Sequence, residues 1–197
     1  VYAIIEKVSR GKDRLDFQKL SADGSTGSWL LDINRMDPEP ENGWPAPNGA
    51  KQPWYFHTGG RNRIVESVPN GPVGGDDEPQ QSNCYINFDN PSGYTINTAQ
   101  RAAIEGWFKQ FEDVLWNNNL WRDPVLGYRK YLDPVDFADY FILNVLTRNG
   151  DGLLLSMYPW KGDDGKLRMG PGWDYNWSAF YISGGATGDL MWRSDQL

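Results

Sequence analysis

Residues 146–176 read LTRNGDGLLLSMYPWKGDDGKLRMGPGWDYN, and this stretch decides our interpretation of the fold. Asp151 lies on a predicted tight turn that directly follows a predicted helix. A β-hairpin is predicted next, and Asp174 lies on the turn after that hairpin. The frame therefore predicts two carboxylates on neighbouring turns, facing a common cleft.

The hairpin itself is predicted from its turn residues. Gly162 to Gly165 (GDDG) resembles a favoured hairpin turn, with strands expected at Leu153 to Lys161 and at Lys166 to Met169. Asn149 to Gly152 (NGDG) combines the residue types that favour tight turns. One hairpin turn and two strands are thus expected between the candidate carboxylates.

Two helices are predicted before this stretch. Asn97 and Gln100 have the spacing of a capping box, and apolar residues then recur every three or four positions over Thr98 to Asn118. The second helix begins at Asp133-Pro134, because aspartate is a favoured N-cap and proline a favoured first helical residue. Its second half is apolar nearly all round, which predicts a helix in the middle of a packed lobe.

The first part of the chain is predicted to be an antiparallel meander. Its three strands are expected at Val1 to Val8, Arg14 to Leu20 and Ser28 to Asn34, separated by polar, glycine-containing turns. We expect this meander to pack near the helical lobe. The predicted fold class is therefore α+β.

Residues 35–97 lose this periodicity and are predicted to form an irregular insertion, mostly coil. Proline and glycine, which interrupt helices and sheets, are dense there. Short strands are expected only at Trp54 to Thr58, Arg63 to Ser67 and Cys84 to Phe88. Two interpretations stay open, a surface insertion with little regular structure or a lid that faces a substrate.

Composition removes several classes of protein. The 197 residues carry a net charge of −7, which argues against nucleic acid as the main partner because phosphate binding needs a cationic surface. Cys84 is the only cysteine and His57 the only histidine, so an internal disulfide framework and a cysteine- or histidine-based metal cage are not expected. No apolar run approaches the length of a membrane span. Since the chain opens with Val1 inside an apolar run, we expect a fragment or a processed piece.

Two turn carboxylates in this frame match what phosphoryl transfer requires. One carboxylate must orient the incoming hydroxyl group, and another must hold the magnesium ion that bridges the phosphates. Aspartate is also common in turns for purely local reasons, so Asp151 and Asp174 alone do not distinguish a catalytic site from ordinary turns.

Three ordered motifs resemble the CotH (spore coat protein H) kinase family. These are the segment LTRNGDG with the hairpin and GPGWDYN, the opening VYAIIEKVSRGKDRLDFQKL, and the helix DPVDFADYFILNVLTRN. The resemblance spans residues 1–34 and about 98–180, whereas residues 35–97 match less well. It implies an atypical protein-kinase-like fold in one domain over residues 1–197 that lacks its N-terminal part. It also implies ATP and Mg²⁺ or Mn²⁺ as cofactors.

By this resemblance, Asp151 is the catalytic-loop carboxylate and Asp174 the metal ligand. Asn176 follows in the same motif and is either a further polar contact to the metal or phosphate, or a turn-stabilising residue. Protein kinases place a second metal-binding asparagine five residues after the catalytic aspartate, and Ser156 stands there instead. A hydroxyl is a poorer magnesium ligand than an amide oxygen, so a site for two metal ions is in doubt.

Three further residues are candidates for nucleotide or phosphate binding, each with a structural alternative. Lys7 is either a phosphate-contacting lysine or an exposed lysine at a strand end. Arg148 either neutralises a phosphate or is a cation favoured by the C-terminal helix dipole. Trp173 either stacks on a base or belongs to the core.

Three functions follow as hypotheses. The first is an ATP-dependent Ser/Thr protein kinase that acts on a secreted or surface protein and is itself extracellular, in a larger multidomain or surface assembly. The second is a catalytically inactive CotH-like module, for which the 28 Trp, Tyr and Phe residues would suit a glycan- or protein-binding face. The third is a plain interaction domain. The kinase hypothesis differs from the other two in requiring that the Asp151 and Asp174 side chains face one common cleft.

Overall fold

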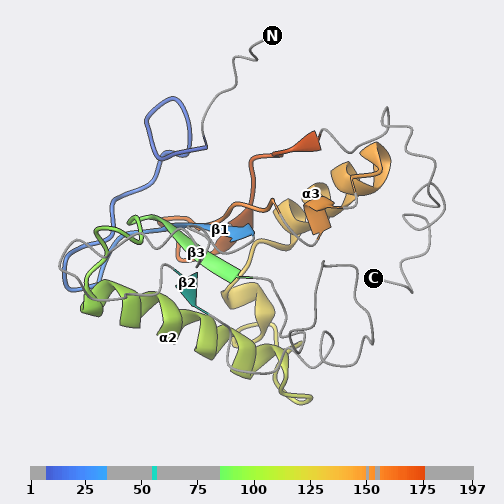
Figure 1. Ribbon diagram of the computed structural model, residues 1–197. Helices are drawn as coiled ribbons and strands as arrows, with labels where there is room; N and C mark the ends of the chain where they lie inside the picture. Colours follow the sequence, from blue (N-terminus) through green and yellow to red (C-terminus); the bar gives the residue numbers. More distant parts are fainter. Residues whose placement is uncertain (1–7, 35–54, 57–84, 150, 154–155, 176–197) are drawn as a thin grey trace, which may run out of the picture.

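The computed structural model describes residues 8–34, 55–56, 85–149, 151–153 and 156–175, which form an α+β domain (Figure 1). One antiparallel sheet has the strand order β2-β3-β1-β4-β5. Two α-helices and two 3₁₀-helices complete the described elements. The strands are β1 (Leu30–Asn34), β2 (Tyr55–Phe56), β3 (Tyr85–Asn90), β4 (Pro159–Lys161) and β5 (Leu167–Met169).

Strand β1 is the centre of the sheet. It pairs with β3 on one side, where Leu31 faces Phe88 and Ile33 faces Ile86, and with β4 on the other, where Leu30 faces Trp160. A register shift between Leu30 and Leu31 interrupts the β1–β3 ladder. Both leucines are completely buried, and they belong to two different hydrophobic clusters. Both faces of β1 are therefore covered, which explains why this central strand begins with two apolar residues in succession.

The larger cluster lies between the sheet and helix α2 (Thr98–Leu115), which runs along one face (Figure 1). The predicted capping box is confirmed. The Asn97 side chain accepts from the Gln100 backbone N–H at 2.9 Å, and the Gln100 side chain accepts from the Asn97 N–H at 3.2 Å. The apolar stripe of α2, including Ile104 and Phe108, packs on residues such as Leu31.

The smaller cluster covers the other side of Leu30. It consists of Val8, Phe17 and Leu30, with Tyr158, Trp160 and Trp173 packed against it. The rings of Phe17 and Trp160 stack at a centroid distance of 5.8 Å, and those of Tyr158 and Trp173 meet edge to face at 5.7 Å. Burial among these aromatic rings fixes the chain around Trp173.

Helix α3 (Pro134–Thr147) begins as predicted. The Asp133 side chain caps it by accepting from the Val135 N–H at 3.0 Å, and the helix ends at Arg148 in the left-handed conformation. Backbone hydrogen bonds from Leu167 to Tyr131 and from Asp133 to Leu167 attach its start to β5.

The prediction that α3 lies in the middle of a packed lobe is wrong. Only Tyr140 and Asn144 are buried in this helix. The apolar residues of the other faces are exposed, with Val135 at 67% and Leu146 at 68%. The sequence makes the helix apolar nearly all round, but in the described part of the chain its main contact with the sheet is to β5. Five large apolar side chains are exposed there: Val135, Phe141, Ile142, Leu143 and Leu146. Neither described α-helix is long and apolar enough to cross a bilayer.

The predicted N-terminal meander is also wrong where the structure describes it. Residues 8–28 contain no strand and make only the isolated bridges Arg10↔Leu15 and Lys19↔Ser28. Strand β1 confirms the third predicted strand, although it begins two residues later. Its partners are β3, over five residue pairs, and β4, at Leu30 and Trp160. Residues 1–7 lie outside the described part.

The region predicted to be an irregular insertion contributes to the sheet. β2 and β3 match the expected strands at Trp54 to Thr58 and Cys84 to Phe88. Phe56, Ile86 and Phe88 are buried in the larger cluster. The expected strand at Arg63 to Ser67 lies outside the described residues, so the extent of the insertion stays a prediction.

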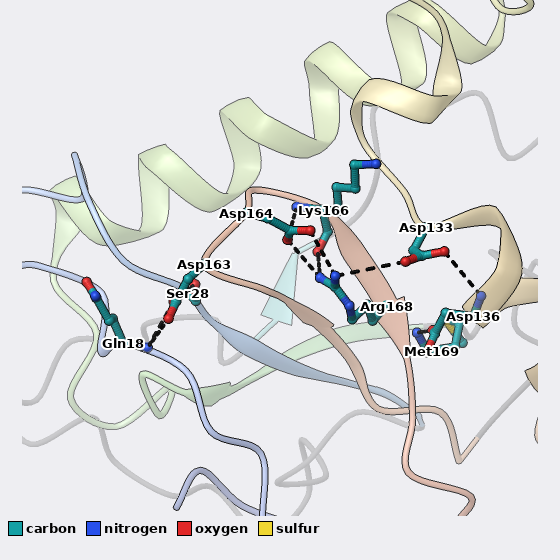
Figure 2. A network of polar contacts seen from close by, with 9 residues as sticks. All are labelled: Gln18, Ser28, Asp133, Asp136, Asp163, Asp164, Lys166, Arg168 and Met169. Atoms are coloured by element: carbon teal, nitrogen blue, oxygen red, sulfur yellow. Dashed lines mark hydrogen bonds and ion pairs between the residues drawn. The ribbon is translucent and has the colours of Figure 1, made fainter. Parts of the chain in front are cut away.

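The β4–β5 hairpin is confirmed, with the expected turn at 162–165, but β4 is only three residues long. Figure 2 shows how polar contacts hold it on both sides. The Asp163 carboxylate accepts from the Gln18 N–H at 2.9 Å and from the Ser28 hydroxyl at 2.8 Å. Within the hairpin, Arg168 donates to both oxygens of Asp164 at 2.8 Å, and on the other side its Nη2 lies 3.9 Å from the Asp133 carboxylate at the start of α3. The hairpin that precedes Asp174 is thereby fixed to the body of the domain.

Candidate functional site

The turn that carries Asp174 follows β5 and contacts the end of the Asp151 segment. The Ser156 hydroxyl donates to Oδ2 of Asp174 at 3.4 Å, which is long for an O–H···O hydrogen bond. Ser156 is buried, with 6% of its surface exposed, whereas Asp174 is exposed. The Asp174 carboxylate therefore contacts a buried hydroxyl group and is also exposed to solvent.

Backbone conformation marks the same region as unusual. Among the described residues, three other than glycine have a positive φ: Arg148 at 54°, Ser156 at 54° and Asp174 at 58°. The left-handed region costs non-glycine residues about 1–2 kcal/mol each, and such residues cluster at functional sites. All three flank the two predicted acidic turns. The strain is therefore concentrated where the sequence predicts the chemistry.

Asp151 opens the 3₁₀-helix η3 (Asp151–Leu153), directly after α3 and its left-handed cap. Its side chain lies outside what the structure describes. Two residues before it, the Asn149 N–H donates to the Asn144 carbonyl at 2.9 Å. Whether the Asp151 carboxylate faces Asp174 stays a prediction.

Buried polar side chains lie beneath this turn. Asn144 and Asn149 are completely buried, and the Asn144 side-chain N–H donates to the Tyr140 carbonyl at 2.8 Å. Burial raises the pKa of Tyr175, and a polar interaction with the Asn149 side chain acts in the opposite direction. Burial likewise raises the pKa of Tyr140 to about 12, with the nearby Tyr175 adding to the effect. Both phenols are therefore neutral at physiological pH.

A pocket of about 350 Å³ opens beside Trp173. One wall comes from the turn after β5 and the other from the first described turn of the chain. Arg14 stands on that second wall, and its Nη1 donates to the Ser9 hydroxyl at 2.7 Å. The lining residues are Val8, Ser9, Asp13, Arg14, Leu15, Pro171, Gly172 and Trp173. The pocket thus combines an aromatic ring, a guanidinium group and a carboxylate next to the Asp174 turn.

The predicted site residues are placed unequally. Trp173 is partly buried and packs on the smaller cluster, as the core interpretation predicts, and it also lines the pocket, where base stacking stays a prediction. Arg148 is exposed at the C-terminus of α3, which agrees with the helix-dipole interpretation, and no contact joins it to Asp174 in the described structure. Lys7 and Asn176 lie outside the described residues.

Sequence reasoning missed Arg14, Asn149 and Tyr175. Arg14 lies in the GKDR segment, which the family resemblance already covers, but no function was assigned to it there. Asn149 and Tyr175 lie inside the two quoted motifs on either side of the aspartates. Their position inside those motifs could have marked them as candidates. Their burial, and the fact that they lie near the two acidic turns in space, could not be inferred from the sequence spacing.

The ligand atoms around Asp174 are oxygens, the type that a hard divalent cation prefers. A carboxylate with a hydroxyl neighbour offers oxygen ligands, which Mg²⁺ and Mn²⁺ prefer. In the described ranges, no three His, Cys, Asp or Glu side chains form a group that could hold a metal ion. A cation at Asp174 would therefore share its coordination with water and a phosphate ligand, as is usual for Mg²⁺.

The described residues form an α+β domain in which the exposed Asp174 carboxylate contacts Ser156, close in sequence to the Asp151 turn. The chain is a member of the CotH kinase protein family, whose model matches residues 75–194, more than half of its length. No curated protein and no solved structure matches it. The match includes residues 75–97, which resemble the family less well by motif, and leaves out residues 1–34.

Family membership gives coarse statements about activity. The description as a kinase indicates a kinase-like phosphotransferase, for which ATP and a divalent cation are the general requirements. Both candidate aspartates and the hairpin between them lie inside the matched range. The pocket residues before Ser28 lie outside it, so that wall of the pocket belongs to the part that the family match leaves out.

Proposed function

We propose that the protein is an ATP- and divalent-metal-dependent Ser/Thr protein kinase of the CotH type. The observation that carries the proposal is the contact between Ser156 and Asp174. Ser156 is five residues beyond Asp151, so the contact joins the segment of the proposed catalytic carboxylate to the proposed metal-binding carboxylate. An aspartate turn on one side and an exposed aspartate on the other match the two roles that phosphoryl transfer needs.

The chemistry divides between the two carboxylates. Asp151 orients the hydroxyl group of the substrate and receives its proton, while the bond from the terminal phosphorus to the bridging oxygen breaks and a bond to the hydroxyl oxygen forms. ADP leaves with that bridging oxygen. Asp174 holds the divalent cation, which would supply charge neutralisation on the phosphates. Asn176 would add its side-chain amide oxygen as a second ligand to the same cation.

The pocket beside Trp173 is the proposed nucleotide site. Trp173 offers a ring on which a base can stack, and Arg14 offers a guanidinium group, which binds phosphate in a bidentate manner. The Ser9 hydroxyl contacts this guanidinium group at 2.7 Å. In this proposal Arg14 works with Lys7 and Arg148 to neutralise the triphosphate. Asp13 lies on the same wall, and its carboxylate would repel a phosphate placed next to it.

The proposed acceptor is a serine or threonine of a secreted or surface protein, and the kinase itself is proposed to be extracellular. This part rests on the resemblance to a family named after a spore coat protein. The net charge of −7 supports a protein acceptor rather than a nucleic acid. A larger surface assembly is the proposed setting.

The test is transfer of ³²P from γ-labelled ATP by the whole 197-residue chain, with Mg²⁺ or Mn²⁺, together with calorimetric titration of Mn²⁺–ATP. Asp174→Ala is expected to abolish metal–nucleotide binding. Asp151→Ala is expected to keep binding but to slow transfer by about 10²–10⁴-fold, because it removes only the proton acceptor. Asp16→Ala, an exposed aspartate elsewhere, is the matched control and is expected to change neither. Full transfer by Asp151→Ala would end the kinase proposal.

A second function is supported by one specific residue. Ser156 stands where protein kinases place a metal-binding asparagine, so the second cation lacks its usual ligand. A catalytically inactive CotH-like binding module is therefore the alternative. It predicts no Mn²⁺–ATP binding by the wild-type chain, so the same titration separates the two.

A further inference from the structure

The loop of residues 116–130, which follows α2, differs in charge from the rest of the chain. It contains three cations, Arg122, Arg129 and Lys130, and one carboxylate, Asp123, in a chain whose net charge is −7. The side chains of all three cations are exposed. The loop is therefore a basic part of the surface on an acidic protein.

Each of the three cations lies over an aromatic ring. Within the residues that the structure describes, none of them forms an ion pair with a carboxylate. An aromatic ring attracts a cation but does not neutralise its charge, so the three charges stay available to an anionic surface. The distances from the cation to the ring centroid are 4.1 Å for Arg122 on Trp121, 4.8 Å for Arg129 on Tyr128 and 5.1 Å for Lys130 on Tyr131.

Between these cations the loop carries an apolar tip, Val125 and Leu126. Their exposed fractions are 73% and 52%, and that of Val125 is the highest among the large apolar side chains of the described residues. The Asp123 carboxylate accepts from the N–H groups of Val125 at 2.8 Å and of Leu126 at 2.7 Å. The Gly127 N–H donates to the Asp123 carbonyl at 3.0 Å, and Pro124 has no N–H group. Every backbone donor of the tip is therefore satisfied inside the loop.

Internal hydrogen bonds of this kind suit a tip that leaves water. An N–H group without a partner is costly in hydrocarbon, where no water can replace the partner. A bilayer can receive a protruding apolar tip at any position on its surface, whereas a protein partner would need a matching pocket. In Figure 1 the chain that follows α2 turns at the lower edge of the domain, away from the sheet. These features favour a lipid surface over a protein partner.

We propose that the loop of residues 116–130 binds a lipid bilayer with anionic headgroups. Val125 and Leu126 insert into the boundary between headgroups and acyl chains, and the three cations lie at the level of the lipid phosphates. Inserted apolar area and cations close to an anionic leaflet both add to membrane affinity. This binding does not depend on the phosphoryl transfer proposed above.

The test is co-sedimentation of the whole 197-residue chain with vesicles of phosphatidylcholine, alone or mixed with phosphatidylglycerol. Wild type is expected to bind the mixed vesicles, and less strongly as salt is added, because salt screens exposed charges. Val125→Asp is expected to weaken binding by about tenfold or more, since it removes an inserted apolar group. Arg129→Gln and Lys130→Gln are each expected to weaken it about fivefold. The matched control is Val135→Asp, at a valine of α3 that is 67% exposed, and it is expected to bind like wild type.

Three results would overturn the proposal. The first is a wild-type chain that does not sediment with the mixed vesicles. The second is an equal loss of binding in Val125→Asp and Val135→Asp, because binding would then not be specific to the loop. The third is full binding by Val125→Asp together with a loss in Arg129→Gln, which would indicate a purely electrostatic contact, such as an acidic protein would make. Thermal unfolding of each variant separates a loss of binding from a loss of folding.

Discussion

Asp163 illustrates how one carboxylate can join distant parts of the chain. Its oxygens accept from the Gln18 N–H, 145 positions away, and from the Ser28 hydroxyl (Figure 2). The sequence analysis places Asp163 only in the hairpin turn, because nothing in the local sequence indicates its partners. The partners become visible only when the hairpin packs against residues 18–28.

Replacing Asp163 with alanine is expected to lower the free energy of unfolding by about 1–2 kcal/mol, since two hydrogen bonds to a charged acceptor are lost while the exposed donors can bind water. Asp163→Asn keeps one acceptor oxygen and is expected to cost less. Urea unfolding monitored by tryptophan fluorescence measures both. Asp16→Ala, at an exposed position, should stay within about 0.5 kcal/mol of wild type; equal losses at the two positions would contradict the assignment.

At the residue scale, the candidate site is only partly predictable. Asp151 and Asp174 can be identified from the sequence because each lies on a predicted turn, one after a predicted helix and the other after a predicted hairpin. Asn149, Ser156 and Tyr175 form contacts that depend on how the two turns pack, and periodicity carries no information about that packing.

The elements with strong end signals are those that the sequence predicts best. Helix α2 has its capping box, α3 has Asp133 with Pro134, and the hairpin has its glycine-flanked turn. Residues 14–20 alternate in polarity as a strand does, yet form none, because strand formation also needs a partner ladder. End signals are local, whereas pairing is not.

The β4–β5 hairpin should respond to acid through Asp164. The hydrogen bonds from Arg168 lower the pKa of Asp164 to about 2, from a usual value of 3.8. A lowered folded-state pKa means that the ionised form stabilises the fold. This contribution is present above about pH 4 and is lost as the pH falls through about 2.

The wild-type chain should therefore lose stability between pH 4 and pH 2 more steeply than Asp164→Asn does. Thermal unfolding at closely spaced pH values measures the slope. The gain is small, because the Asp164 side chain is 45% exposed and such pairs are screened by solvent. Parallel slopes for the two proteins would show that the pair does not contribute.

At the scale of the whole molecule, stability depends on the sheet–α2 core far more than on α3. Ile104 is fully buried in the larger cluster, whereas Leu146 on α3 is 68% exposed. Ile104→Ala is expected to cost about 2–5 kcal/mol through lost burial and a cavity. Leu146→Ala should stay within about 0.5 kcal/mol. Chemical denaturation of the two variants compares them, and a large cost at Leu146 would show that this face of α3 is covered.

The overall class α+β is predictable from the pattern of elements, but the arrangement of the strands is not. Consecutive strands usually pair with each other, and that rule predicts an N-terminal meander. Here β1 pairs with strands from much later in the sequence, and the hydrophobic clusters on its two faces stabilise that pairing. Family membership over residues 75–194 adds the kinase-like assignment, which no pattern of hydrophobicity supplies.

The place of β1 at the centre of the sheet also has a consequence for biosynthesis. As the polypeptide leaves the ribosome, β1 emerges before both of its partners, because β3 arrives more than fifty residues later and β4 later still. Until then, its two leucines have no permanent neighbours, and nascent chains with exposed apolar strands are prone to aggregate. Pairings so distant along the chain also close slowly. Newly made molecules should therefore need chaperone protection until the β4–β5 hairpin has emerged.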